Sequence, residues 1–125
     1  MPQTVFTESA PAAIGPYSQA MIAGELVFTS GQIAIVPETG LLAEGGITAQ
    51  THQVCKNRDQ VLRTAGATQE TAVKTLCFLA DVADFAAFNE VYAQYFTGKP
   101  ARSCVAVKAL PKGALVEVEV VAEKA

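Results

Sequence analysis

The sequence predicts a single α+β domain, residues 1–125, built on a mixed β-sheet of about six strands with two helices packed on one face. Three observations support this fold class. Apolar residues alternate with acidic ones near the C-terminus, as in a strand with one buried face. Two longer segments have the periodicity of amphipathic helices, and glycine or proline stands at the ends of most elements. Helices in a minority among hairpin-like strands are typical of a sheet covered on one side.

The first third of the chain is predicted to be a loop followed by two strands. Residues 11–16 contain two prolines and a glycine, which suit neither a helix nor a sheet ladder. The segment 17–22 can form a short strand, residues 24–25 a tight turn, and 26–35 a β-rich strand. Gly31 interrupts that last strand, and a glycine there often marks a bulge or the close approach of another group to the backbone.

The segment 47–65 has the periodicity of an amphipathic helix. Apolar residues keep one face, and the Gln, Lys, Arg and Asp side chains are expected on the other. Thr48 can cap the start of this helix, and Gly66 can end it. The mostly apolar run 72–80 follows as a central strand.

A second helix is expected to end at Phe96, with Asp81 or Asp84 as its N-cap. Its aromatic residues recur at helical spacing and are expected in the core. The last strands are 103–109 and 115–122. The predicted element order is β-β-β-α-β-α-β-β, in which one strand before the first helix has no assigned range. Helices on one face leave the other sheet face uncovered, so we expect an oligomer.

The composition agrees with an oligomer and disfavours several classes of function. Half of the residues are hydrophobic, only 17% are charged, and the mean hydropathy is +0.27, which is apolar for a small domain. A net charge of −3 without a basic cluster argues against general nucleic-acid binding, which uses Lys and Arg against phosphates. No apolar run approaches the roughly 20 residues of a membrane-spanning helix, so no membrane partner is expected.

Cysteine and histidine usage predicts a cytoplasmic protein without a metal site. The three cysteines, Cys55, Cys77 and Cys104, form no CxxC pair. The first residues lack the basic and apolar regions of a signal peptide. His52 is the only histidine, so a zinc ligand set is not expected.

Arg102 and Cys104 lie in the run Pro-Ala-Arg-Ser-Cys at 100–104. A guanidinium fixed behind a proline matches the two oxygens of a carboxylate, so Arg102 either binds a carboxylate or forms a surface ion pair. Cys104 is either a nucleophile, which needs a neighbouring base or positive charge, or a small core residue.

Five further polar residues remain ambiguous on pattern alone. Glu117 shares one strand face with Glu119, and either is a candidate general acid/base or a solvated carboxylate. Asn89, within the second helix, faces either a pocket or water. Tyr17 and Ser30 stand beside glycine and proline turns and indicate nothing specific by themselves.

Five runs of residues resemble the RidA/YjgF family of reactive-intermediate (enamine/imine) deaminases. They are AIGPYSQA at 13–20, TSGQI at 29–33, DFAAFNEVY at 84–92, PARSCV at 100–105 and VEVEV at 116–120. Each run is weak evidence by itself, but the five occur in the family's order and are spread over nearly the whole chain.

The resemblance implies a chorismate-mutase-like fold, a homotrimer with clefts between neighbouring subunits, and no cofactor. It implies hydrolysis of 2-iminoacids, formed from 2-aminoacrylate and 2-aminocrotonate, to 2-ketoacids and ammonia. A non-enzymatic protein of the same fold, which binds small ketoacids or regulates another process, is the alternative.

The resemblance also implies a role for each site residue. Arg102 would bind the substrate carboxylate, and Glu117 rather than Glu119 would handle the water. The connection 96–100 is shorter than the family's, so we expect a different cleft rim and substrate size preference. The positions implied to line the cleft are Tyr17, Ser30, Gly31, Asn89 and Cys104.

Overall fold

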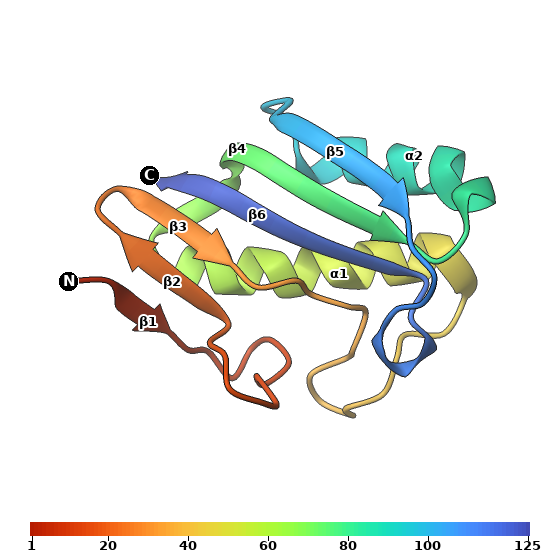
Figure 1. The fold of residues 1–125 in the computed structure, drawn as a ribbon, viewed down its shortest axis with the longest axis horizontal. Coiled ribbons are helices and arrows are strands. Elements are labelled where there is room, and N and C mark those ends of the chain that lie inside the picture. The colour runs from red at the N-terminus through yellow and green to blue at the C-terminus, as the bar shows by residue number, and fades with distance from the viewer.

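The computed structural model describes residues 1–125 and has the predicted order of elements (Figure 1). The elements are β1 (Gln3–Val5), β2 (Ala20–Ala23), β3 (Leu26–Thr29), α1 (Gly46–Thr64), β4 (Ala67–Leu79), α2 (Phe85–Tyr95), β5 (Ala101–Ala106) and β6 (Val116–Lys124). The strands form one six-stranded sheet in the order β1-β2-β3-β6-β4-β5. The β4–β5 pair is parallel and the others are antiparallel, so the sheet is mixed, as predicted.

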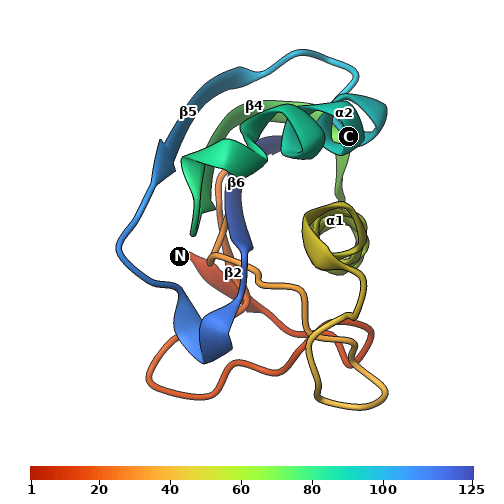
Figure 2. The same ribbon diagram turned by 90° about the vertical axis from the view of Figure 1, so that its right-hand side faces the viewer.

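Both helices cover one face of the sheet, which curves around them (Figure 2). Along β6 the valines at 116, 118 and 120 are buried toward the helices, and Glu117 and Glu119 project from the opposite face. That open face is apolar between its acidic residues. Its apolar side chains include Phe28, Leu76, Phe78 and Val105.

Helix α1 differs from the prediction at its start and at two buried positions. It begins at Gly46, after Gly45 with φ 112°, so the prediction of Thr48 as its cap is wrong. Its end is as predicted, because Gly66 follows in a left-handed conformation, φ 87°. The expected polar face is wrong at Gln50 and Arg58, which are both buried. Arg58 lies four residues after Val54 on the apolar face and is 0% exposed.

Strand β3 ends at Thr29 instead of continuing to 35, because the chain leaves its ladder with β6. Regular pairing stops at Phe28–Val121 and resumes as one bridge at Gln32–Val118. Residues 29–31 therefore lie opposite only 119–120, which is a β-bulge next to Gly31. Strand β2 is likewise shorter than the predicted 17–22 and begins at Ala20.

Strand β4 begins at Ala67, five residues earlier than predicted, and its first part is irregular. Two register shifts against β6 separate the pairs of Ala67, Ala72 and Lys74. Polar residues fill this part, so its sequence shows no strand periodicity. Strand β5 begins at Ala101 and ends at Ala106 rather than spanning 103–109.

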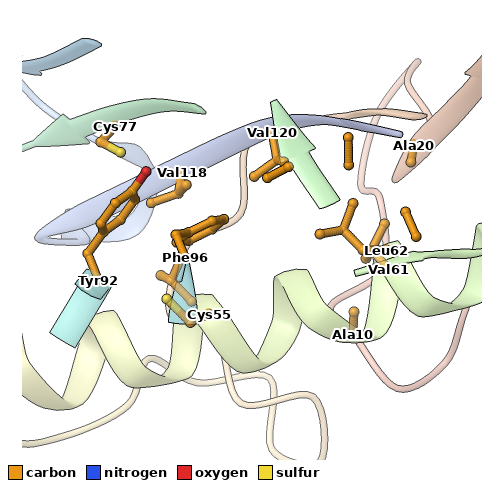
Figure 3. Close-up of a cluster of buried hydrophobic side chains, with 14 of the residues drawn as sticks. Ala10, Ala20, Cys55, Val61, Leu62, Cys77, Tyr92, Phe96, Val118 and Val120 are labelled. Carbon is orange, nitrogen blue, oxygen red and sulfur yellow. The ribbon is translucent and has the colours of Figure 1, made fainter. Parts of the chain in front are cut away.

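The core lies between the helices and the buried face of the sheet (Figure 3). It contains the β6 valines, Leu62 of α1, and Phe88 and Tyr92 of the predicted aromatic stripe. Asp81 caps the short 3₁₀ turn that leads into α2, accepting a 2.9 Å hydrogen bond from the Ala83 backbone N–H. None of the helices is both long and apolar enough to cross a lipid bilayer.

Candidate active site

The structure places the predicted site residues in two groups on opposite faces of the sheet. Arg102 pairs with Thr75, whose side chain is buried toward α2 and bonds Tyr92. Glu117 pairs with Phe78, three residues further along β4 and hence on the open face. One chain therefore does not bring the guanidinium and the carboxylate together over a single small molecule.

Arg102 belongs to the first group and lies over aromatic rings of α2. Its guanidinium carbon is 4.8 Å from the ring centre of Tyr92, and its Nη1 donates a 2.7 Å hydrogen bond to Oδ1 of Asn89. Tyr92 is held in turn by a 2.7 Å hydrogen bond to the Thr75 hydroxyl. The Asn89 contact leaves the other guanidinium nitrogens without a protein acceptor, so they can bind an anion.

The cavity beside Arg102 has a volume of about 550 Å³, enough for a small organic acid. The connection 96–100, which the resemblance predicts to be shorter than the family's, forms its rim together with the end of α2. Lys99 lines it in a left-handed conformation, φ 52°. Cys104 lies two residues beyond Arg102 on the same face of β5 and is half-buried.

Glu117 belongs to the second group, which also contains Tyr17, Ser30 and Gly31. These residues line one cavity of about 410 Å³. A Cβ atom on residue 31 would lie only 2.1 Å from Oε2 of Glu117, so only glycine leaves room for this carboxylate. This contact confirms the prediction that another group closely approaches the backbone at Gly31.

Burial raises the pKa of the Glu117 carboxyl above its ordinary value. The like charge of Glu119 raises this pKa further, and the positive charge of Arg58 lowers it. The structure thus separates the two glutamates that the alternation left equivalent. The carboxyl of Glu117 occupies the cavity with a raised proton affinity, which suits a group that both accepts and donates a proton.

Hydrogen bonds from buried residues fix the walls of the Glu117 cavity. Ser30 donates its hydroxyl to the Ser18 carbonyl at 2.6 Å and its backbone N–H to the Gln19 carbonyl at 3.0 Å. The Gln19 side chain bonds the backbones of Thr7 and Pro11, and so holds the loop that carries Tyr17. The cavity is preorganised by these contacts.

No side chain in either group has the surroundings of an activated nucleophile. Burial raises the pKa of the Cys104 thiol, and Arg102 only partly offsets the effect. His52 bonds the Tyr95 hydroxyl at 2.8 Å, between the two helices, rather than a cysteine. The geometry therefore favours water activation over a covalent intermediate.

Three residues support the site without having been predicted from the sequence to do so. No pattern marked Gln19, and the helical spacing of the aromatic residues marked Tyr92 only as a core residue. Arg58 carried a usable signal, because it falls at helical spacing between Val54 and Val61 on the apolar face.

The chain resembles known proteins over its whole length. The sequence model of a family described as "Endoribonuclease L-PSP" matches residues 7–124. A RutC family protein of Pyrococcus horikoshii is 48% identical over 125 residues, 99% of each chain. The human 2-iminobutanoate/2-iminopropanoate deaminase is 44% identical over 96% of this chain and 88% of its own.

Solved structures agree with these sequence matches. A yeast protein, YEO7, superposes with a TM-score of 0.96 at 47% identity, covering 100% of both chains. E. coli TdcF with bound serine has a TM-score of 0.93 at 38% identity, covering 98% of this chain and 99% of its own. The chain belongs to the RidA/YjgF family. For this RidA-family chain the resemblance of the five runs is confirmed, and so is the fold that it implied.

Proposed function

We propose that this chain hydrolyses 2-iminoacids such as 2-iminopropanoate and 2-iminobutanoate to 2-ketoacids and ammonia. The observation that carries the proposal is the pair of preorganised charges, Arg102 with free donors beside a cavity and Glu117 packed on Gly31 with a raised pKa. The name of the human relative agrees with this substrate class. E. coli TdcF holds serine, another small molecule with a carboxylate beside a nitrogen-bearing carbon.

In the proposed mechanism Arg102 binds the substrate carboxylate through two charge-assisted hydrogen bonds, each contributing roughly 1.5–3 kcal/mol. Glu117 accepts a proton from water as the water oxygen bonds to the imine carbon. Glu117 then delivers this proton to the nitrogen. The carbinolamine loses ammonia as the C–N bond breaks, and its hydroxyl gives up a proton as the carbonyl forms. The atoms of water and the iminoacid equal those of the ketoacid and ammonia, and no electrons are transferred. The reaction therefore needs no cofactor.

We further propose that the working site lies between two copies of the chain in a homotrimer. Arg102 and Glu117 project from opposite sheet faces, so Arg102 of one copy would face Glu117 of a neighbour. The open face also exposes apolar side chains, with Phe28 43% and Val105 51% accessible, which a second copy would cover. Light scattering of the purified protein tests the trimer, and a monomer mass would contradict it.

A coupled assay tests the reaction. A pyridoxal-phosphate dehydratase acting on serine or threonine generates the enamine in situ, and ketoacid release is measured with and without this protein. We expect faster release with the wild type and none of this gain with Arg102→Ala. Equal release with both proteins would contradict the proposal.

Two other functions make different predictions. A ketoacid-binding protein would bind 2-oxobutanoate without accelerating imine hydrolysis, so calorimetric binding with an inactive wild type would favour it. The description of the family model points to RNA cleavage. The net charge of −3 gives this function little support, and incubation of RNA with wild type and Glu117→Gln distinguishes specific cleavage from contamination.

A further inference from the structure

Arg58 of α1 is a buried cation without an acidic partner. It is 0% exposed, and its Nε and one terminal nitrogen contact no acceptor. The one ion pair of the structure joins Arg63 and Asp59, on the exposed side of the same helix. Burial lowers the pKa of Arg58 to about 10, so the side chain stays charged at neutral pH. Burying such a charge is costly, so its two hydrogen bonds need a functional explanation.

The two hydrogen bonds of Arg58 both go to the bulge at 29–31. Its Nη1 donates to the Thr29 hydroxyl and, at 3.1 Å, to the Ser30 carbonyl. The Thr29 hydroxyl also accepts the Val120 backbone N–H at 2.9 Å, in place of a ladder bond. Arg58 therefore satisfies polar groups that the bulge leaves unpaired in the core.

The same bulge packs against the Glu117 side chain. Residue 31 contacts the Glu117 carboxylate directly, and residue 30 bonds Arg58 on its other side. Glu119 on β6 acts on Glu117 with a like charge, and Arg58 acts with an opposite one. Lys112 and Tyr17 line the Glu117 cavity from two further segments. Arg58 is the one buried Lys or Arg side chain, and the bulge residues Ser30 and Gly31 connect it to this carboxylate.

We propose that Arg58 is a positioning residue for the hydrolysis, which holds the Thr29–Gly31 bulge against Glu117 and places a positive charge behind that bulge in the core. The inference rests on the proposed function, because it assigns Arg58 to the water-activating half of that site. Arg58 touches neither cavity and therefore acts only through the bulge and through its charge.

Replacing Arg58 by a neutral and by a charged side chain distinguishes the effect of its hydrogen bonds on the bulge from the effect of its charge on Glu117. Arg58→Met keeps the volume but removes the positive charge, so the pKa of Glu117 should rise. The acid limb in a plot of kcat against pH should therefore move to higher pH. Arg58→Lys keeps the charge but reaches one acceptor, so kcat should fall roughly tenfold with the limb near its wild-type pH. KM should change little in both, because Arg102 lies on the other sheet face.

Asn57→Leu is the matched control. Asn57 is also buried in α1 and donates to the carbonyls of Ile33 and Ile35 in the wall of the same cavity, but it carries no charge. We expect a lower kcat without movement of the acid limb. An unmoved limb in Arg58→Met, or the same movement in Asn57→Leu, would overturn the role of the charge.

A titration that does not depend on activity keeps this test separate from the proposed function. The carboxyl carbon of Glu117, labelled with ¹³C, is followed by NMR against pH in wild type, Arg58→Met and Arg58→Lys. We expect a higher midpoint in Arg58→Met alone. If the wild type hydrolyses no imine but this midpoint moves, the proposed function fails and the coupling of Arg58 to Glu117 stands. If Arg58→Met does not fold, a clear shift of the midpoint in Arg58→Lys would contradict the inference.

Discussion

At the scale of single residues, the two proposed catalytic charges have contrasting surroundings. Arg102 lies on aromatic rings at the edge strand of the sheet and keeps free donors toward a cavity. Glu117 lies on a glycine backbone on a more central strand, where desolvation and Glu119 hold its pKa up. The first arrangement suits recognition of an anion, and the second suits movement of a proton.

Arg102→Lys should reduce kcat/KM for iminoacid hydrolysis about a hundredfold, because one ammonium group replaces a two-pronged donor. Most of the loss should appear in KM, since the group binds the carboxylate throughout the reaction. Arg63→Lys is the control, because Arg63 is exposed and pairs only with Asp59. Steady-state kinetics that show equal losses for both variants would contradict the assignment of Arg102.

Glu117→Gln should change how stability depends on pH. Folding raises the pKa of Glu117, so its contribution to stability is fully present below the unfolded pKa and is lost as pH rises through the folded pKa. The variant lacks this loss and should be the more stable protein at neutral pH. Urea unfolding from about pH 4 to 8 measures the difference, with Glu44→Gln on an exposed loop as control.

At the scale of elements, the interruption between β3 and β6 shapes the Glu117 half of the site. The bulge turns Ser30 and Gly31 toward the carboxylate, and α1 supplies the hydrogen bonds that the broken ladder lacks. The sequence indicated this feature through Gly31, but it also predicted that the same strand continues beyond the glycine to residue 35. The polar groups of the bulge are hydrogen-bonded by a side chain of α1, a helix remote in sequence. Local sequence patterns do not show such a contact.

Gly31→Ala should displace the Glu117 carboxylate, because the new Cβ would overlap it. We expect kcat to fall by about tenfold or more, while circular dichroism stays that of the wild type. The double variant Gly31→Ala, Glu117→Asp retracts the carboxylate by one methylene and should recover part of the loss. A fully active Gly31→Ala protein would show that the close contact has no catalytic role.

At the scale of the whole molecule, Arg102 and Glu117 lie on opposite faces of the sheet, which leads to a specific prediction about assembly. Arg102→Ala and Glu117→Gln chains, each inactive alone, should form active mixed trimers when co-expressed or refolded together. Random mixing leaves both residues intact at roughly a quarter of the interfaces, so about a quarter of wild-type activity is expected. A mixture with no activity would place both residues in one chain's site.

Much of the architecture follows from local chemistry in the sequence. The alternation at 116–120 predicted which residues of β6 are buried, and glycine or proline marked the β2–β3 turn and the end of α1. The element order and the two-helix cover were predicted from the same short-range patterns. These features depend on backbone sterics and on the burial of one face, which neighbouring residues determine.

Only the tertiary structure decided how the chemically important groups are arranged. The alternation in β6 places Glu117 on the face opposite the buried valines, but no local pattern shows that Arg102 lies on the other face. The face of Arg102 depends on the register of β5 with β4. The burial of Arg58 depends on where α1 meets the bulge, and the pKa of Glu117 depends on that same junction. Electrostatics and close packing act between residues that meet only after folding, so the sequence named the residues and the fold determined their chemistry.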